Sequence, residues 1–158
     1  MNYRVINYKE DFKNDVLAAI DQGYKDIGYS GIELDSLDQD LINIQESYQA
    51  PSFFKLVFNE DELIATYAVK IKDQKAELKR VYVKESHRGK GLAKQISLDA
   101  FAEVKNLGFN NIDIWSGTLC NTAHNLYQKL GAQKTQSSRI LGGKDSVVEY
   151  LFVKDLIS

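Results

Sequence analysis

The residues with the clearest chemistry lie in Glu77–Lys94, where a strand-like segment leads through two glycines into a helix-like segment. The turn and the start of the helix read Arg88, Gly89, Lys90, Gly91, Leu92, Ala93 and Lys94. A helix N-terminus has backbone N–H groups without intrahelical partners and a partial positive charge, so it binds phosphate. Glycines let a ligand approach the backbone, and basic side chains add positive charge. The segment therefore predicts a diphosphate site.

Two common nucleotide motifs are absent from the sequence. A phosphate loop of the Walker type needs a Gly, then four residues, then Gly-Lys-Ser/Thr, and the sequence contains no such run. The Rossmann fingerprint is also absent, because neither its glycine spacing nor its acidic residue is found. The motif present is Arg88-x-x-Gly91-x-Ala93. It resembles the acyl-CoA pyrophosphate motif of the GNAT superfamily, the acetyl-CoA-dependent N-acetyltransferases. Because the motif is short, the alternative interpretation is an ordinary surface helix that begins with two glycines and binds no ligand.

The order of elements around this turn supports the resemblance. A β-prone run, Leu78–Val83, precedes the glycines, and a second one, Ile112–Trp115, follows the helix. The helix between them has apolar residues at three- and four-residue spacing: Ala93, Ile96, Ala100, Val104 and Leu107. A further helical stripe is expected at Leu119, Ala123, Leu126 and Leu130. A helix between two strands implies a parallel, right-handed crossover.

The second helix carries the other half of the resemblance. Many GNAT proteins have Ala, three residues, Tyr and then Lys-Leu-Gly-Phe here, and this chain has Ala123, Tyr127 and Lys129 through Ala132. Cys120 stands where the commonest form has asparagine, and Asn121, one position later, is assigned to the cofactor on this resemblance. The similarity is strongest over about Glu62–Ala132.

The alternation of apolar residues in Leu78–Val83 predicts an irregular strand. Strict alternation would place Leu78 on one face and both Val81 and Val83 on the other, whereas a one-residue bulge near Lys79 or Arg80 brings all three to one side. We predict the bulge. In the GNAT family such a bulge splays two parallel strands, so the resemblance implies that backbone groups of Val81 and Val83 bind the pantetheine arm. A strand buried on both faces is the alternative.

Acetyl transfer to an amine needs a base for the amine proton and benefits from an acid for the leaving thiolate. The resemblance makes Tyr127 the candidate acid, with a packing tyrosine as the alternative. Glu77 occupies a position where some family members have a catalytic glutamate, although a solvated strand-edge glutamate is equally compatible with the sequence. His124 is expected to be a packed or solvent-facing histidine. Cys120 is not expected to act as a nucleophile, because direct transfer needs no covalent enzyme intermediate.

The expected order of elements is β-α-α-β-β-β-α-β-α-β-β, the order that the resemblance implies. The fold class is therefore α/β (α+β mixed sheet), a central mixed sheet with helices on both faces. Outside the motifs, the expected elements are a strand at Tyr3–Tyr8, a helix from Phe12 to Tyr24, a helix or helix-rich loop at Leu34–Tyr48, a hairpin of Phe53–Phe58 and Leu63–Ile71, and a strand at Ser146–Val153. By resemblance, Gly23–Ser36 forms the wall of the acceptor site.

Composition narrows the class of protein. The 158 residues predict one domain, residues 1–158, with 44% apolar and 27% charged residues. A formal charge of −2 and the lack of long Lys/Arg runs argue against nucleic acid as a partner. Cys120 is the only cysteine and there are two histidines, so we expect neither a disulfide nor a metal. No signal-like segment or 18-residue apolar run exists, which predicts a cytoplasmic protein without membrane partners.

These observations predict a GNAT-type N-acetyltransferase, which is an acyltransferase. Acetyl-CoA would be the cosubstrate, and the acceptor would be a primary amine of a small molecule or peptide that attacks the thioester directly. Two alternatives remain at this point: a non-catalytic acyl-CoA-binding or sensing module, and an ordinary α/β domain that binds another phosphate ligand. A homodimer is left open.

Overall fold

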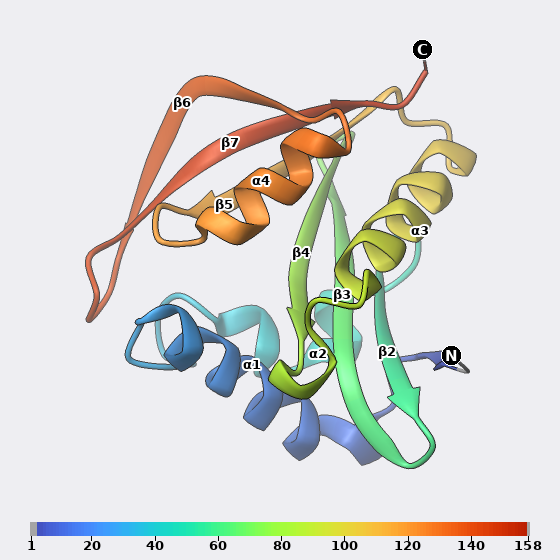
Figure 1. Ribbon diagram of the computed structural model, residues 1–158, viewed down its shortest axis with the longest axis vertical. Helices are drawn as coiled ribbons and strands as arrows, with labels where there is room; N and C mark the ends of the chain where they lie inside the picture. Colours follow the sequence, from blue (N-terminus) through green and yellow to red (C-terminus); the bar gives the residue numbers. More distant parts are fainter. Residues whose placement is uncertain (1–2, 158) are drawn as a thin grey trace.

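The computed structural model describes residues 3–157, which form one mixed sheet with strand order β1-β2-β3-β4-β5-β7-β6. The strands are β1 Tyr3–Asn7, β2 Phe53–Asn59, β3 Glu62–Lys72, β4 Lys75–Val83, β5 Asn111–Gly117, β6 Gln133–Gly142 and β7 Val147–Asp155. Neighbouring strands are antiparallel except for β4 and β5, which are parallel. Figure 1 shows the sheet with its C-terminal hairpin, β6 and β7, reaching away from the central strands.

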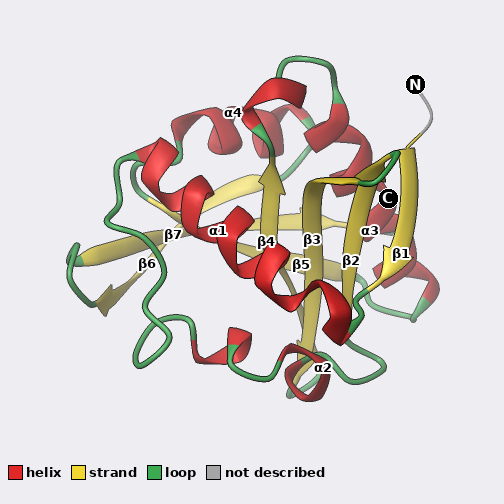
Figure 2. Ribbon diagram, turned by 90° about the horizontal axis from the view of Figure 1, so that it is seen from below, coloured by secondary structure: helices red, strands yellow, loops and turns green. Residues whose placement is uncertain are grey.

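Helices cover both faces of the sheet (Figures 1 and 2). The α-helices are α1 Lys13–Ile27, α2 Ile44–Ser47, α3 Leu92–Asn106 and α4 Asn121–Lys129, and three short 3₁₀ helices are η1 Glu10–Phe12, η2 Gln39–Leu41 and η3 Glu85–His87. α1 and α2 pack on one apolar cluster, and α3 and α4 pack on another. β3 lies between the two clusters, which explains its nearly continuous buried run, Ile64–Val69.

The predicted order of elements and the predicted fold class are confirmed. Within the segment 34–48, the only helices are η2 and the four-residue α2. Of the two predicted alternatives, the structure therefore has the helix-rich loop and not one long helix. None of the described helices combines the length and apolar character needed to cross a membrane.

The stripe predicted for α4 is wrong at its first position. Leu119 precedes the helix and is 51% exposed, because the chain turns between β5 and α4 at this point. The residues that α4 buries are His124 and Tyr127. Leu107 also lies outside its helix, as the C-terminal cap of α3, and is 45% exposed. Each error follows from extending helical periodicity into a turn.

Candidate functional site

β4 contains the predicted bulge. Tyr82 pairs with Thr66 and Lys79 pairs with Ala68, so Arg80 and Val81 together lie opposite one residue of β3. Arg80 has φ of 58°, a left-handed conformation that is unusual outside glycine. Across the bulge, Leu78, Val81 and Val83 all pack against the same apolar cluster, as predicted.

β4 and β5 diverge beyond the bulge (Figure 1). Within the described residues, their parallel ladder contains one pair, Glu77 with Asp113. The N–H of Lys84 donates to Ile64 O of β3 at 2.8 Å, and neighbouring residues of a strand alternate in direction, so the N–H and C=O of Val83 point away from β3. Those groups therefore face the side on which β5 separates from β4.

The glycine turn presents bare backbone at the start of α3. Gly89 and Gly91 have φ of 75° and 83°, and a Cβ at either position would meet no described atom within 4 Å. Gly91 is the N-cap, and no described side chain caps the helix there. Leu92 buries its side chain in the core, so it can offer a ligand only its backbone, while Lys90 and Lys94 are exposed. The turn therefore has the free N–H groups and nearby positive charge that an anion needs.

Arg88 links this turn to two other elements. Its Nε donates to Val83 O at 2.7 Å, and its Nη2 lies 2.8 Å from Asp26 Oδ2 at the end of α1. A hydrogen bond from Gln22 and the contact with Arg88 lower the pKa of Asp26. Arg88 thus holds the turn in place as well as carrying charge beside it.

α4 places Tyr127 against the core beside β7. The side chain is 5% exposed, and its ring centroid lies 6.4 Å from that of Phe152. Burial raises the pKa of Tyr127 well above its ordinary value, with a contribution from nearby Cys120, so the phenol stays protonated at neutral pH. A protonated phenol can donate its proton, although the raised pKa makes it a weaker acid than an exposed tyrosine.

Three more residues from the sequence analysis, Cys120, Asn121 and His124, lie at the start of α4. His124 is packed, 9% exposed, and shares a 3.1 Å hydrogen bond with Ser116. Asn121, at the first turn of α4, is exposed. Burial raises the pKa of the Cys120 thiol, which makes it a poor nucleophile at neutral pH.

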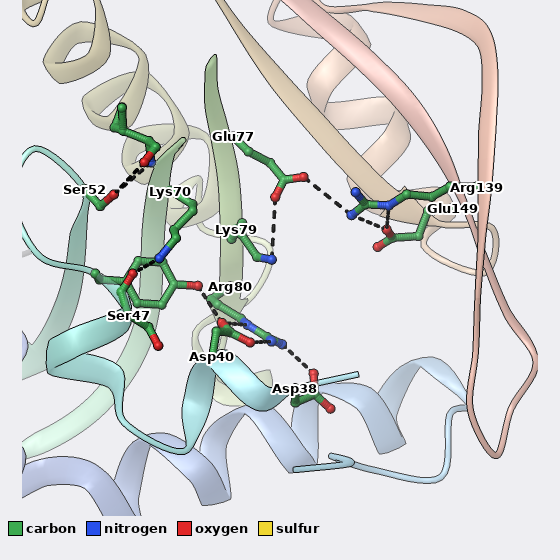
Figure 3. Close-up of polar contacts among 12 residues, drawn as sticks. Asp38, Asp40, Ser47, Ser52, Lys70, Glu77, Lys79, Arg80, Arg139 and Glu149 are labelled. Carbon is green, nitrogen blue, oxygen red and sulfur yellow. Dashed lines mark hydrogen bonds and ion pairs between the residues drawn. The ribbon is translucent and has the colours of Figure 1, made fainter. Parts of the chain in front are cut away.

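Glu77 lies in a group of charged side chains on the face of the sheet that also carries α1 (Figure 3). Its Oε1 is 3.5 Å from Arg139 Nη2, and its Oε2 is 3.5 Å from Lys79 Nζ. Arg139 also contacts Glu149 at 2.7 Å and lies 4.4 Å from the ring centroid of Trp115. Glu77 is part of a central strand with a side chain 21% exposed, so it is not a solvated edge residue.

Arg80 is at the centre of a buried polar cluster that sequence reasoning missed (Figure 3). Its guanidinium contacts Asp38 at 2.9 Å, Asp40 at 2.5 Å and the Tyr24 hydroxyl at 2.7 Å. The Arg80 and Asp38 side chains are 7% and 4% exposed. Tyr48 donates to Asp40 at 2.6 Å. The cluster fastens the segment between α1 and α2 to the bulge of β4.

The same segment also contacts the turn between β6 and β7. The N–H and hydroxyl of Ser30 donate to the Asp145 carboxylate at 2.8 and 2.6 Å. The N–H of Lys144 lies 3.2 Å from both carboxylate oxygens of Glu33, which is 8% exposed. The region expected to form the acceptor wall is therefore bound to β4 at one point and to the C-terminal hairpin at another.

Two cavities, of about 600 and 420 Å³, lie around α2 and the start of β2, and none of the predicted site residues lines them. Among residues 3–157, no three His, Cys, Asp or Glu side chains converge where they could hold a metal ion. The backbone of the splayed strands and the glycine turn define the candidate site.

A mixed sheet with one splayed parallel pair, followed by a glycine turn at a helix N-terminus, is the GNAT arrangement that the sequence resemblance implied. The model of the acetyltransferase (GNAT) family matches residues 18–132, and the chain belongs to this family.

Known proteins similar to this chain agree with that family. The uncharacterized N-acetyltransferase YvbK of Bacillus subtilis (strain 168) is 40% identical over 72 residues, which are 45% of this chain and 46% of that protein. The chain thus matches about half the length of this curated relative.

Two solved structures share the fold. A GNAT-family acetyltransferase from Staphylococcus aureus Mu50 has a TM-score of 0.85 at 18% identity, over 98% of this chain and 99% of that one. YncA, a putative acetyltransferase from Salmonella typhimurium solved with its cofactor acetyl-CoA, has a TM-score of 0.75 at 14% identity, over 100% and 96% of the two chains.

Proposed function

We propose that this protein transfers the acetyl group of acetyl-CoA to a primary amine of a small molecule or peptide. The observation that carries the proposal is the splayed pair β4 and β5, which opens toward the uncapped N-terminus of α3. Membership of the GNAT family and the acetyl-CoA bound by the Salmonella protein support the choice of cosubstrate.

The residues present fit such a ligand. Gly89 and Gly91 leave open space where a side chain would stand, so the diphosphate can reach the N–H groups at the start of α3. Lys90, Lys94 and the backbone of Leu92 and Ala93 complete this part of the site, and Arg88 keeps the turn against β4. The backbone groups of Val81 and Val83 would pair with the pantetheine arm, and Asn121 would lie beside it.

The chemistry is direct attack on an activated acetyl thioester. The amine nitrogen bonds to the acetyl carbon and the carbon–sulfur bond breaks. The Tyr127 hydroxyl gives its proton to the departing thiolate, and Glu77 takes the proton that the amine loses, directly or through water. Tyr127 is protonated at neutral pH and can donate, and burial, which raises its pKa, makes it a weaker acid than an exposed tyrosine. Arg139 and Lys79 keep the Glu77 carboxylate near β6 and β4.

An amine panel tests this function. Thiol release from acetyl-CoA is measured with and without each amine, and binding of acetyl-CoA is measured by thermal shift. Amine-dependent thiol release is the expected result. Binding without release would favour an acyl-CoA-binding or sensing module, and no thermal shift would favour another phosphate ligand. The cytoplasmic location, the absence of nucleic-acid, membrane and metal partners, and any homodimer stay predictions.

A further inference from the structure

Arg139 of β6 reaches across the sheet to the closed end of the splayed pair (Figure 3). Its guanidinium carbon lies 4.4 Å from the ring centroid of Trp115 in β5, and its Nη2 lies 3.5 Å from Glu77 Oε1 in β4. Within residues 3–157, Glu77 and Asp113 form the one ladder pair of these strands, so the pair opens from here toward the glycine turn. With the diphosphate at that turn and the pantetheine arm between the strands, the thioester of the proposed cosubstrate would point to Arg139.

The guanidinium of Arg139 has an open edge. Its Nε and Nη2 each lie 2.7 Å from Glu149 Oε1. The 3.5 Å contact of Nη2 with Glu77 is longer than an ordinary charge-assisted hydrogen bond. Among the described residues Nη1 has no hydrogen-bond partner, and the side chain is 37% exposed. The edge formed by Nη1 and Nη2 is therefore accessible, while Glu149 and the Trp115 ring hold the group in place.

Two carboxylates lie beside this edge. Glu77 and Asp113 are paired on adjacent strands, so their side chains project from the same face of the sheet, and Trp115, two positions after Asp113, shares that face. Asp113 is half-buried and has no ion pair or side-chain hydrogen bond with a described residue. Lys79 is paired with Glu77, through Oε2 at 3.5 Å, and leaves Oε1 on the side of Arg139. An ammonium group beside Glu77 and Asp113 would be stabilised by both charges.

A site for an anion and a site for a cation therefore lie side by side. In an α-amino acid the amino group and the carboxylate are bonded to one carbon atom, so they are neighbours, as Arg139 Nη2 and Glu77 Oε1 are. A simple amine would leave the open edge of Arg139 unused. A diamine would bring a second cation toward the guanidinium.

We propose that the acceptor is a free α-amino acid and that Arg139 selects it by binding its carboxylate. The carboxylate takes the open edge in a bidentate contact, which replaces the long contact of Arg139 with Glu77. Glu77 then takes a proton from the amino group, whose nitrogen attacks the acetyl carbon as the carbon–sulfur bond breaks. The products are an N-acetylamino acid, CoA with its thiol and one proton released to solvent. This inference rests on the proposed function and narrows its acceptor.

The test compares each α-amino acid of an amine panel with its own α-amide, which lacks the carboxylate charge, and with a diamine. For the best acceptor, wild-type kcat/KM should be about ten- to hundredfold higher for the acid than for the amide, the difference expected for hydrogen bonds to a charged group. Arg139→Gln should abolish this preference, mainly by raising KM for the acid. Because the substitution also frees Glu77 and Glu149 for every acceptor, the ratio of acid to amide is the readout.

Two further variants sharpen the result. Arg139→Lys keeps the charge without the fork, so it should retain only part of the preference. Lys134→Gln is the matched control, because Lys134 is the other cation of β6 that stacks on an aromatic ring, with Nζ 4.1 Å from the centroid of Tyr150. Tyr150 packs on the apolar cluster of α3 and α4, on the opposite face from Trp115, so this variant should keep the wild-type ratio. An unchanged thermal shift with acetyl-CoA confirms that each variant is folded, and if Arg139→Gln loses that shift, the ratio in Arg139→Lys decides.

Trp115 supplies a second measurement that needs no turnover. It is the only tryptophan of the chain, and Arg139 lies against its ring. In the CoA complex, the best amino acid should change the fluorescence of the wild type at concentrations where its amide does not. Arg139→Gln should need about ten- to hundredfold more of the amino acid for the same change.

Equal kcat/KM for acid and amide, or a preference for the diamine, would overturn this inference. An acid preference that survives in Arg139→Gln would do the same. In these cases thiol release still depends on an amine, so the proposed function stands. A wild type that binds acetyl-CoA but releases no thiol with any amine overturns the proposed function, and this inference with it.

Discussion

Arg80 Nη1 and Asp38 Oδ1 lie 2.9 Å apart and join the bulge of β4 to the segment between α1 and α2. Arg80 also contacts Asp40 and Tyr24, and its side chain is 7% exposed. The strand irregularity beside the proposed cofactor site and the segment proposed as the acceptor wall therefore share one buried cluster. A substitution at Arg80 should therefore disturb both the bulge of β4 and the segment between α1 and α2.

Arg80→Met should strongly destabilise the fold, because it leaves the Asp38 and Asp40 carboxylates buried without their counter-charge. The expected loss is about 3–5 kcal/mol in the free energy of unfolding, measured with urea. Lys79→Met, at the next position of the same strand, is the matched control. The Lys79 side chain is 29% exposed and pairs with Glu77 at 3.5 Å, so the variant should lose no more than about 1 kcal/mol in the free energy of unfolding. A loss within about 1 kcal/mol for Arg80→Met as well would show that the cluster adds little stability.

The stability of the wild type should fall in acid as Asp40 becomes protonated. Burial alone would raise the pKa of Asp40, but the Arg80 contacts outweigh burial and lower it. A carboxyl with a lowered folded pKa adds stability above its unfolded value, about 3.9, and that stability is lost as pH falls through the folded pKa. In Arg80→Met, Asp40 is buried without its counter-charge, so its folded pKa rises above the unfolded value. Its protonation then favours the folded state, and this variant should lose less stability than the wild type, or gain some, as pH falls toward about 4. Urea titrations from neutral pH to pH 3 measure this, and superimposable pH profiles would contradict it.

Gly91→Val should abolish the thermal shift with acetyl-CoA. The branched side chain would occupy the open space at the start of α3, where the diphosphate is expected. Wild-type protein should gain about 2.7 kcal/mol at a hundredfold excess of ligand over its Kd. Gly108→Val is the control: Gly108 follows the other end of the same helix, has φ of 96° and also faces open space. Gly108→Val should introduce similar backbone strain but keep the full thermal shift with acetyl-CoA. If both variants lose the thermal shift, backbone strain rather than a blocked diphosphate site is the cause.

Tyr127→Phe should lower turnover and leave folding and acetyl-CoA affinity nearly unchanged. Loss of a general acid costs about 10²–10⁴ in rate, and the low end is expected because a thiolate is a tolerable leaving group. Pre-steady-state measurements must establish that chemistry, rather than product release, limits both enzymes. A wild-type rate under those conditions would make Tyr127 a packing residue.

Glu77→Gln should slow acetyl transfer most at low pH, where little neutral amine is available and a base helps most. The pH profile of kcat/KM for the best amine measures this effect. Glu60→Gln, at the exposed turn between β2 and β3, is the control and should leave the profile unchanged. An equal fall for Glu77→Gln at all pH values would indicate that Glu77 orients Arg139 rather than taking a proton.

The sequence predicted the elements around the proposed cofactor site, because their signals are local. The glycine turn lies within seven consecutive residues, and the bulge in β4 follows from the faces of Leu78, Val81 and Val83. The splay of β4 and β5 came from the family resemblance, and the register confirms it.

The acceptor side could not be predicted, because its contacts are long-range. Arg80 and Lys79 are adjacent basic residues in one strand, and nothing local shows that Arg80 takes a left-handed conformation and reaches Asp38, 42 positions away. β6 is a polar edge strand, so its residues lack the apolar alternation that reveals a half-buried strand.

The contacts between the segment after α1 and the turn between β6 and β7 also set an order for biosynthesis. Ser30 is 115 positions from Asp145, and Glu33 is 111 positions from Lys144. A growing chain can assemble β4, the glycine turn and α3 from nearly contiguous residues. It cannot join Ser30 and Glu33 to the C-terminal hairpin until the last strands have left the ribosome, because contacts of such long sequence separation form late. A nascent chain would therefore gain the turn proposed to bind phosphate well before the proposed acceptor wall is complete.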